Sequence, residues 1–430
     1  MEANHYLELD CQTLVSTIHL IQQNQQQYVI ESKRKAIQLT HDLVQQSVIS
    51  RSVADVPLGT FLSGGVDSSI VSLSLAQASS AKIDTFSIGF EKKSFDETDK
   101  SRTVAKLINS NHHEFIIGEK DLSARLSDIL LNFDEPFADS SALASFVVAD
   151  KTSQFVKVAL TGDGGDEVFG GYNKYLMGIL NQQYTSIILE SIHFSIKNSL
   201  IKFLNIQDDN RGLKFKFSRL IKAINYEGDF YYNIISLGFT PEELKNLLLD
   251  NSYIPEPLLY YKNNRDAKTL TDFRNIDLQL SLEGDLNVKV DRTSMLASIE
   301  CRAPFLNKDL WAFSQQLPEQ FLIHRWDKKH ILKEAFKQYF PEKFLDKSKK
   351  GFAVPVGDWL RSALKKELEA YIDKEFLERQ NIFNPDETSR LVRDHIQGKI
   401  DNTFRVWTFY CFQKWYTMKY TNRFAEGELY

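Results

Sequence analysis

In the first half of the chain, short apolar runs typical of strands alternate with segments whose apolar residues have helical spacing. Residues 56–62 form an apolar run typical of a buried strand, and residues 70–76 continue with helical spacing. The alternation of strand and helix patterns continues along the chain. Strands are expected at 83–90, 113–117 and 156–160, and helices at 98–108, 122–131 and 142–152. Strands that alternate with helices of this length predict an α/β protein with a doubly wound, mostly parallel sheet.

The strand signal fades after about residue 175, where helical spacing takes over. Helices are expected at 176–204, 213–225, 278–296, 330–339 and 404–420, and one long amphipathic helix at 11–50. The pattern predicts three parts. They are a linker and helix at 1–50, an α/β core at 51–175, and a largely helical part at 176–430 that packs on the core.

Composition excludes several classes of protein. The 430 residues carry a formal net charge of −5, which gives no general attraction to nucleic acid, although residues 211–222 include a basic helical segment. Three distant cysteines form neither a disulfide framework nor a zinc pattern. The N-terminus lacks a signal peptide and no apolar run approaches about 20 residues. We expect a cytoplasmic protein with neither nucleic acid nor membrane as partner.

The stretch that follows the first strand, residues 63–69, reads S-G-G-V-D-S-S. Glycine has no Cβ, so Gly64 and Gly65 let the backbone approach an anion closely. Ser63, Ser68 and Ser69 add hydroxyl donors, and the N-terminus of the next helix adds N–H groups. An ordinary strand–turn–helix junction is the competing explanation. The pattern predicts a phosphate cradle, and it lacks the Walker sequence.

A second glycine-rich loop, T-G-D-G-G-D-E at residues 161–167, follows the strand at 156–160. The carboxyl ends of parallel strands meet at one edge of a sheet, so both loops can line one crevice. Each loop carries an aspartate, Asp67 and Asp166. Mg²⁺ prefers one or two carboxylates together with phosphate oxygens and water, which makes this pair a candidate metal site. Turn or helix-cap roles are the alternative.

Further motifs extend this pattern through most of the chain. They stand at residues 85–90, 94–97, 134–141, 161–172, 288–295, 299–306 and 349–355. Together with the loop at 63–69, their order resembles the synthetase domain of glutamine-dependent asparagine synthetases, which belong to the ATP pyrophosphatases. The resemblance covers roughly residues 50–420. It implies ATP and Mg²⁺ as cofactors, cleavage of ATP between the α and β phosphates, and a carboxylate activated as an acyl-AMP.

The resemblance also implies roles for individual residues. Lys349 aligns with the family's catalytic lysine, although the charge run around it also fits a solvated surface. Glu300 and Arg302 align with residues of the synthetase site, or mark a helix end stopped by proline. Asp163 either affects the acyl-adenylate or caps a helix. The residues expected to bind nucleotide are Leu62, Ser63, Gly64, Gly65, Asp67, Ser68, Ser69, Ile88, Thr161 and Gly162, with Asp67 and Asp166 as metal ligands.

The chain departs from the family at its start. Only about 60 residues precede the first loop, which is too few for the glutaminase domain, so we expect an excised form or a stand-alone synthetase. The default reaction joins L-aspartate and ammonia to give asparagine. Ammonia would come from solution, a separate glutaminase or a substrate amine. Alternative substrates are a surface sugar acid, a β-lactam precursor or a peptide carboxylate. An alternative function is a non-enzymatic nucleotide-binding role. A homodimer is a further possibility.

Overall fold

The central element of the fold is a five-stranded parallel sheet. The computed structural model describes residues 5–21, 26–90, 98–118, 121–122, 124–201, 224–228, 230–235, 239, 241–250, 267–346 and 354–421. The strands are β3 (Leu58–Phe61), β4 (Asp84–Phe90), β5 (Asn111–Ile117), β6 (Val158–Leu160) and β7 (Glu300–Arg302), in the order β5-β4-β3-β6-β7. Every neighbouring pair is parallel, which confirms the predicted α/β class.

This strand order places a topological switch between β3 and β6. From β3 the chain adds β4 and β5 on one side, then returns to lay β6 against the other side of β3, with Thr60 opposite Leu160. In open parallel sheets, ligands bind beyond the carboxyl ends of the strands at such a point. The two glycine-rich loops follow β3 and β6, so the topology brings them together there.

Helices cover both faces of the sheet and enclose two apolar cores. One face carries α1 (Lys33–Arg51), α2 (Val66–Ala78) and α3 (Thr98–Leu107), and the other carries α5 (Leu126–Leu131), α6 (Ser141–Thr152) and α15 (Val288–Leu296). Successive strand residues point to opposite faces, so Ala159 belongs to one core and Leu160 to the other. Burial of both faces explains why β6 is an uninterrupted apolar run.

The second half is mostly helical, as predicted. Its elements before β7 are α7 (Gly165–Phe169), α8 (Asn173–Ile187), α9 (Glu190–Ile201), α11 (Phe230–Ile235), α12 (Pro241–Leu247), α14 (Leu270–Asp277) and the π-helix η1 (Leu278–Asn287). Those after β7 are η2 (Pro304–Leu306), α16 (Lys308–Gln315), α17 (Glu319–Leu322), α18 (His330–Phe336), η3 (Lys337–Tyr339), α19 (Val356–Arg361), α20 (Lys365–Tyr371), α21 (Lys374–Gln380), α22 (Pro385–Ile396), α23 (Thr403–Tyr416) and η4 (Thr417–Thr421).

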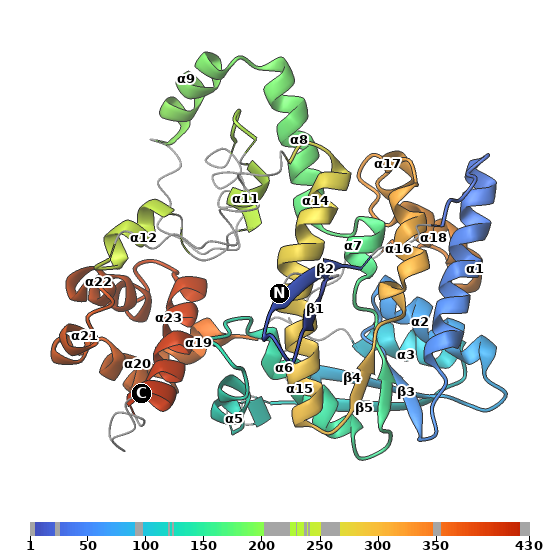
Figure 1. The fold of residues 1–430 in the computed structure, drawn as a ribbon, viewed down its shortest axis with the longest axis horizontal. Coiled ribbons are helices and arrows are strands. Elements are labelled where there is room, and N and C mark those ends of the chain that lie inside the picture. Colours follow the sequence, from blue (N-terminus) through green and yellow to red (C-terminus); the bar gives the residue numbers. More distant parts are fainter. Residues whose placement is uncertain are drawn as a thin grey trace.

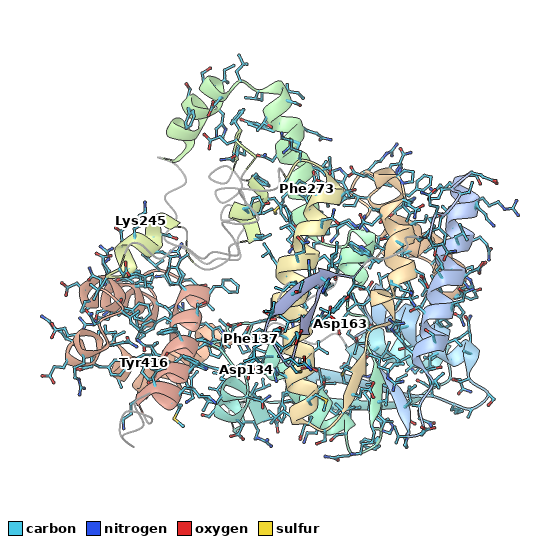
Figure 2. All side chains as sticks on the ribbon, in the orientation of Figure 1. Asp134, Phe137, Asp163, Lys245, Phe273 and Tyr416 are labelled. Atoms are coloured by element: carbon cyan, nitrogen blue, oxygen red, sulfur yellow. The ribbon has the colours of Figure 1, made fainter. Side chains whose placement is uncertain are left out.

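Helices α14, η1 and α15 form a continuous column through the middle of the molecule. In Figure 1 the C-terminal helices α19–α23 gather on one side of this column, and α1, α2, α16 and α18 lie on the other. Figure 2 labels Asp163 beside the lower part of the column and Tyr416 among the C-terminal helices. No helix within the described ranges is long and apolar enough to cross a membrane.

The predicted helix at 11–50 is wrong in its first half. Strands β1 (His5–Leu9) and β2 (Ser16–Leu20) form an antiparallel hairpin there, where a linker and helix were expected. The Asp10 carboxylate accepts hydrogen bonds from the amides of Gln12 (2.7 Å) and Thr13 (3.0 Å) and so turns the chain. Helix α1 begins only after Ser32, whose hydroxyl accepts a hydrogen bond from the amide of Lys35 (3.2 Å).

Two further differences lie in the region expected to be helical. Strand β7 is three residues long and lies just before Pro304. Three residues are too few for the alternation of a strand to be detected in the sequence. The expected helix at 176–204 is two helices, α8 and α9, separated at Ile188 and Leu189. The expected helix at 213–225 lies almost entirely outside the described residues.

Candidate active site

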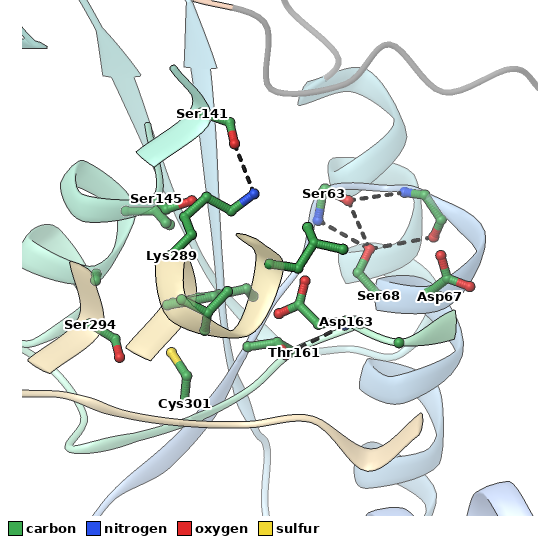
Figure 3. A pocket seen from close by; sticks show the side chains of 18 of the residues that line it. Ser63, Asp67, Ser68, Ser141, Ser145, Thr161, Asp163, Lys289, Ser294 and Cys301 are labelled. Atoms are coloured by element: carbon green, nitrogen blue, oxygen red, sulfur yellow. Dashed lines mark hydrogen bonds between the residues drawn. The ribbon is translucent and has the colours of Figure 1, made fainter. Parts of the chain in front are cut away.

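A pocket of about 270 Å³ lies at the carboxyl ends of β3 and β6. The loops after these two strands form one wall, and β4, α6, α15 and β7 supply the others. Figure 3 shows the pocket with Ser63 and Ser68 at one end and Lys289 and Ser141 at the other. The pocket therefore occupies the switch point that the topology marks as a ligand site.

The first loop holds its shape through glycine and two serines. Gly64 has φ +74°, and a Cβ there would lie 2.5 Å from Cβ of Lys100. Only glycine fits this conformation without strain. The Ser68 hydroxyl accepts a hydrogen bond from the Ser63 amide (3.2 Å) and lies 3.0 Å from the Ser63 hydroxyl. No described side chain caps helix α2 at Gly65. Gly65, Asp67 and Ser68 line the pocket, so the N-terminus of α2 faces it.

The second loop packs directly against the first. A Cβ on Gly162 would lie 2.8 Å from the amide nitrogen of Ser68, and one on Gly165 would lie 2.5 Å from Oδ1 of Asp67. Real Cβ atoms do not approach so closely, so these glycines are what allows the loops to touch. Thr161, Gly162 and Asp163 line the pocket in consequence.

The loop contact places Asp67 and Asp166 around one buried lysine. Nζ of Lys329 lies 2.5 Å from Oδ2 of Asp67 and 2.7 Å from Oδ1 of Asp166. The lysine side chain is only 9% exposed. Gly171 makes room for this arrangement, because a Cβ there would overlap the Asp166 carboxylate and the lysine stem. The structure thus joins the two predicted metal ligands and adds a cation that the sequence analysis missed.

The environment of Lys329 keeps it charged. Burial alone would lower the pKa of Lys329, but the carboxylates of Asp166 and Asp67 raise it above its ordinary value. The residue directly precedes α18 with φ +53°. In the sequence it belongs to a K-K-H-I-L-K run that resembles a solvated helix start, so no local signal distinguishes it.

The two aspartates fit a divalent cation. Their oxygens converge on one point, which the Lys329 ammonium occupies here as a positive charge. Two carboxylates supplemented by phosphate oxygens and water suit Mg²⁺. In the described part of the chain no group of three or more His, Cys, Asp or Glu side chains could hold a metal by itself. A metal here would therefore depend on the nucleotide for the rest of its ligands.

Most of the predicted nucleotide-binding residues reach the pocket. Ser63, Gly65, Asp67, Ser68, Thr161 and Gly162 line it, and Leu62 and Ile88 form an apolar wall with Phe61 and Phe86. Gly64 shapes its loop without lining the pocket. Ser69 is fully buried away from the cavity, and its hydroxyl has no hydrogen-bond partner among the described residues.

The remaining predicted residues lie elsewhere. Nε of Arg302 donates to Oε1 of Glu300 at 2.7 Å, and Arg302 also donates to the carbonyl oxygens of Arg51 and Val53. Neither side chain lines the pocket, whereas Cys301 between them does, because alternate strand residues face opposite ways. Burial raises the pKa of the Cys301 thiol to about 12. Lys349 and the motif at 94–97 lie outside the described residues.

Two further motif residues, Arg292 and Asp134, form an ion pair with each other. Arg292, on α15, pairs with Asp134 near α5, and not with its neighbour Asp291. His112 and His113 lie on β5. Trp407, Tyr410 and Cys411 are buried in α23.

The strand order and the glycine-rich loop at the switch point define a nucleotide-binding α/β protein of the ATP pyrophosphatase type. The asparagine synthase family model matches residues 39–417. The chain therefore belongs to the asparagine synthase family, a family of ATP-using ligases.

Relatives share moderate identity with the chain. Asparagine synthetase [glutamine-hydrolyzing] 1 of Bacillus subtilis (strain 168) is 28% identical over 409 residues, 92% of this chain and 61% of that protein. Asparagine synthetase [glutamine-hydrolyzing] 3 of the same strain is 26% identical over 346 residues (74% and 50%). Amidase chry2 of Gibberella zeae is 23% identical over 365 residues (76% and 54%). The chain spans about half to three fifths of the length of these relatives.

Proposed function

We propose that the protein is an ATP-dependent amide-forming ligase that activates L-aspartate as β-aspartyl-AMP and converts it with ammonia into asparagine. One observation carries the proposal. Two glycine-rich loops meet at the switch point of the sheet and bring Asp67 and Asp166 to one pocket, where both carboxylates pair with Lys329. Membership of the asparagine synthase family supports the same reaction class.

The first step needs the α-phosphorus exposed and the pyrophosphate stabilised. A carboxylate oxygen attacks the α-phosphorus, the bond to the bridging oxygen breaks, and pyrophosphate leaves with the bond electrons. The loop at 63–68 would hold the phosphates through backbone N–H groups and the hydroxyls of Ser63 and Ser68. Leu62 and Ile88 would face the adenine.

Positive charge near the leaving group lowers the barrier. Lys329 lies beside the phosphate loop, and Lys349 is the lysine indicated by the family motif. A lysine about 4 Å from a phosphate charge contributes about 4 kcal/mol at an effective dielectric constant near 20, before desolvation. Asp67 and Asp166 would hold Mg²⁺, which neutralises pyrophosphate charge when bound.

The second step forms the amide bond. Ammonia attacks the acyl carbon, the carbon–oxygen bond to AMP breaks, and a proton leaves the nitrogen. Ammonia would come from solution, from a separate glutaminase or from a substrate amine. The three-part organisation at 1–50, 51–175 and 176–430, a cytoplasmic location and a homodimer remain predictions from the sequence.

A second candidate function uses the same activation of a carboxylate by ATP but with a different acid substrate. One relative, at 23% identity, is named as an amidase and not as an asparagine synthetase. The acid would then be a surface sugar acid, a β-lactam precursor or a peptide carboxylate. The adenylation half of the proposal is common to all of these.

The test is release of AMP and pyrophosphate from MgATP and ammonium, with and without L-aspartate, beside a Lys349→Ala variant. We expect AMP that depends on aspartate, reduced at least about 100-fold in the variant, because an electrostatic contact in the transition state is lost. ADP as product would refute adenylation. AMP without dependence on aspartate would refute the choice of acid alone.

A further inference from the structure

The lysine that pairs with Asp67 and Asp166 lies behind them as seen from the pocket. Both aspartates line the cavity, whereas Lys329 is not among the described residues that do. Nζ of Lys329 reaches Oδ2 of Asp67 at 2.5 Å and Oδ1 of Asp166 at 2.7 Å, from the residue that precedes α18. In Figure 3 Asp67 lies beside Ser68, at the end of the pocket formed by the phosphate loop. The two carboxylates therefore separate a buried ammonium from the expected position of the phosphates.

The chain around Lys329 is shaped to hold this arrangement. A Cβ on Gly171 would overlap Oδ1 of Asp166 and Cε of Lys329, so glycine is needed there. Lys329 itself has φ +53°, a backbone conformation that residues with a side chain rarely adopt. Such a conformation persists only where the surrounding structure holds it. The contact of one ammonium with two carboxylates is therefore a built feature of the site.

Lys329 changes the charge that the site offers to a metal. Two carboxylates alone carry two negative charges, and the ammonium of Lys329 reduces their sum to one. The affinity of an oxygen site for a divalent cation depends on the number of charged ligands and on their rigidity. The described part of the chain adds no third His, Cys, Asp or Glu to this pair. The protein without nucleotide therefore offers a divalent cation a fixed but weakly charged site.

The phosphates of ATP would supply the ligands and the negative charge that the site lacks. We infer that Lys329 is a positioning residue that makes binding of the divalent cation depend on the nucleotide. It fixes both carboxylates and lowers their joint charge, so that metal and nucleotide bind together and the metal alone binds weakly. This inference rests on the proposed function, because it concerns the ATP site of that reaction.

The experiment measures the binding of Mn²⁺, which suits the same carboxylate and water ligands as Mg²⁺. Equilibrium dialysis gives the Mn²⁺ held by the protein, with and without α,β-methylene-ATP, an analogue that cannot be cleaved between the α and β phosphates. The proteins are wild type, Lys329→Met, Lys329→Arg and the double variant Lys329→Met with Asp166→Asn. Lys328→Met is the matched control, since Lys328 acts electrostatically on Asp166 from the next position but forms no ion pair with it among the described residues.

Wild type should bind Mn²⁺ tightly only when the analogue is present. Without the analogue, Lys329→Met should bind Mn²⁺ at least about 30-fold more tightly than wild type, because a positive charge close to the metal has been removed. Lys329→Arg keeps the charge and should bind as wild type does, as should Lys328→Met. The double variant should lose the Mn²⁺ binding that Lys329→Met gains.

Wild type that binds Mn²⁺ equally well with and without the analogue would overturn the inference, and this result needs no variant to fold. A Lys329→Met protein with the wild-type circular dichroism spectrum and no gain in Mn²⁺ binding would overturn it as well. So would a gain that survives Asp166→Asn, because the metal would then lie elsewhere. The proposed function fails in a different way, if metal and analogue bind together as expected but MgATP, L-aspartate and ammonium give no AMP.

Discussion

Removal of the Lys329 ammonium tests whether Asp67 and Asp166 form a cation site. The Lys329→Met variant keeps the length of the stem and deletes the charge that lies 2.5 Å and 2.7 Å from the two carboxylates. In the absence of Mg²⁺ the two aspartates would then face each other in a buried setting. The free energy of unfolding should fall for this reason.

The magnitude follows from the burial of the pair. Removing one partner of a buried ion pair costs about 3–5 kcal/mol, because the other charge is left uncompensated. Unfolding entropy near 2.1 cal/mol/K per residue, over 430 residues, makes 1 kcal/mol equal to about 1 °C. We expect the melting temperature of Lys329→Met to fall by about 3–5 °C without Mg²⁺.

Added Mg²⁺ should restore most of this loss in the variant. At 100 times its dissociation constant, a ligand of the folded state adds about 2.7 kcal/mol, hence about 3 °C by the same entropy. Differential scanning fluorimetry over a MgCl₂ titration measures the shift. Lys414→Met breaks an ion pair outside the pocket, with Glu367, and should lose stability without recovery. Equal responses to Mg²⁺ in the two variants would refute a cation site at the aspartates.

Three other predictions follow from the same geometry. Gly162→Ala should lower ATP affinity at least about 10-fold in calorimetry, because overpacking by 1–3 kcal/mol separates the loops. Burial and Asp139 raise the pKa of Asp285 to about 6, so its stabilising contribution is present below about pH 4 and lost as pH rises through 6. Asp285→Asn should remove this decline in urea unfolding. Cys301, with its raised thiol pKa, should react with iodoacetamide far more slowly than exposed Cys11 at pH 8, by mass spectrometry.

Each of these has a matched control or a contrary outcome. Gly284→Ala is the control for the loop glycine, since a Cβ there meets nothing within 4 Å. Equal ATP affinity in Gly162→Ala and Gly284→Ala would contradict the close packing of the loops. If the free energy of unfolding of Asp285→Asn falls between pH 4 and 6 as it does in wild type, the fall belongs to another titrating group. Alkylation of Cys301 at the rate of Cys11 would contradict its raised thiol pKa.

Local patterns were sufficient to predict most of the sheet. The expected strands at 83–90, 113–117 and 156–160 correspond to β4, β5 and β6. Of these, β6 is buried on both faces and is a continuous apolar run. The hairpin of β1 and β2 was mistaken for a helix, since its turn depends on side-chain hydrogen bonds of Asp10 that leave no periodic trace. Strand β7 was missed because three residues are too few to show a period.

The sequence by itself determined the two glycine-rich loops, because glycine positions and strand–helix alternation are local properties. Only the tertiary structure decided which charges meet. Lys329 pairs with Asp67 across 262 residues, and Lys289 pairs with Asp139 across 150. It also turned Glu300 and Arg302 toward each other and Cys301 toward the pocket. The physical reason is that an ion pair depends on the distance between two atoms, and that distance is set by the packing of the whole chain.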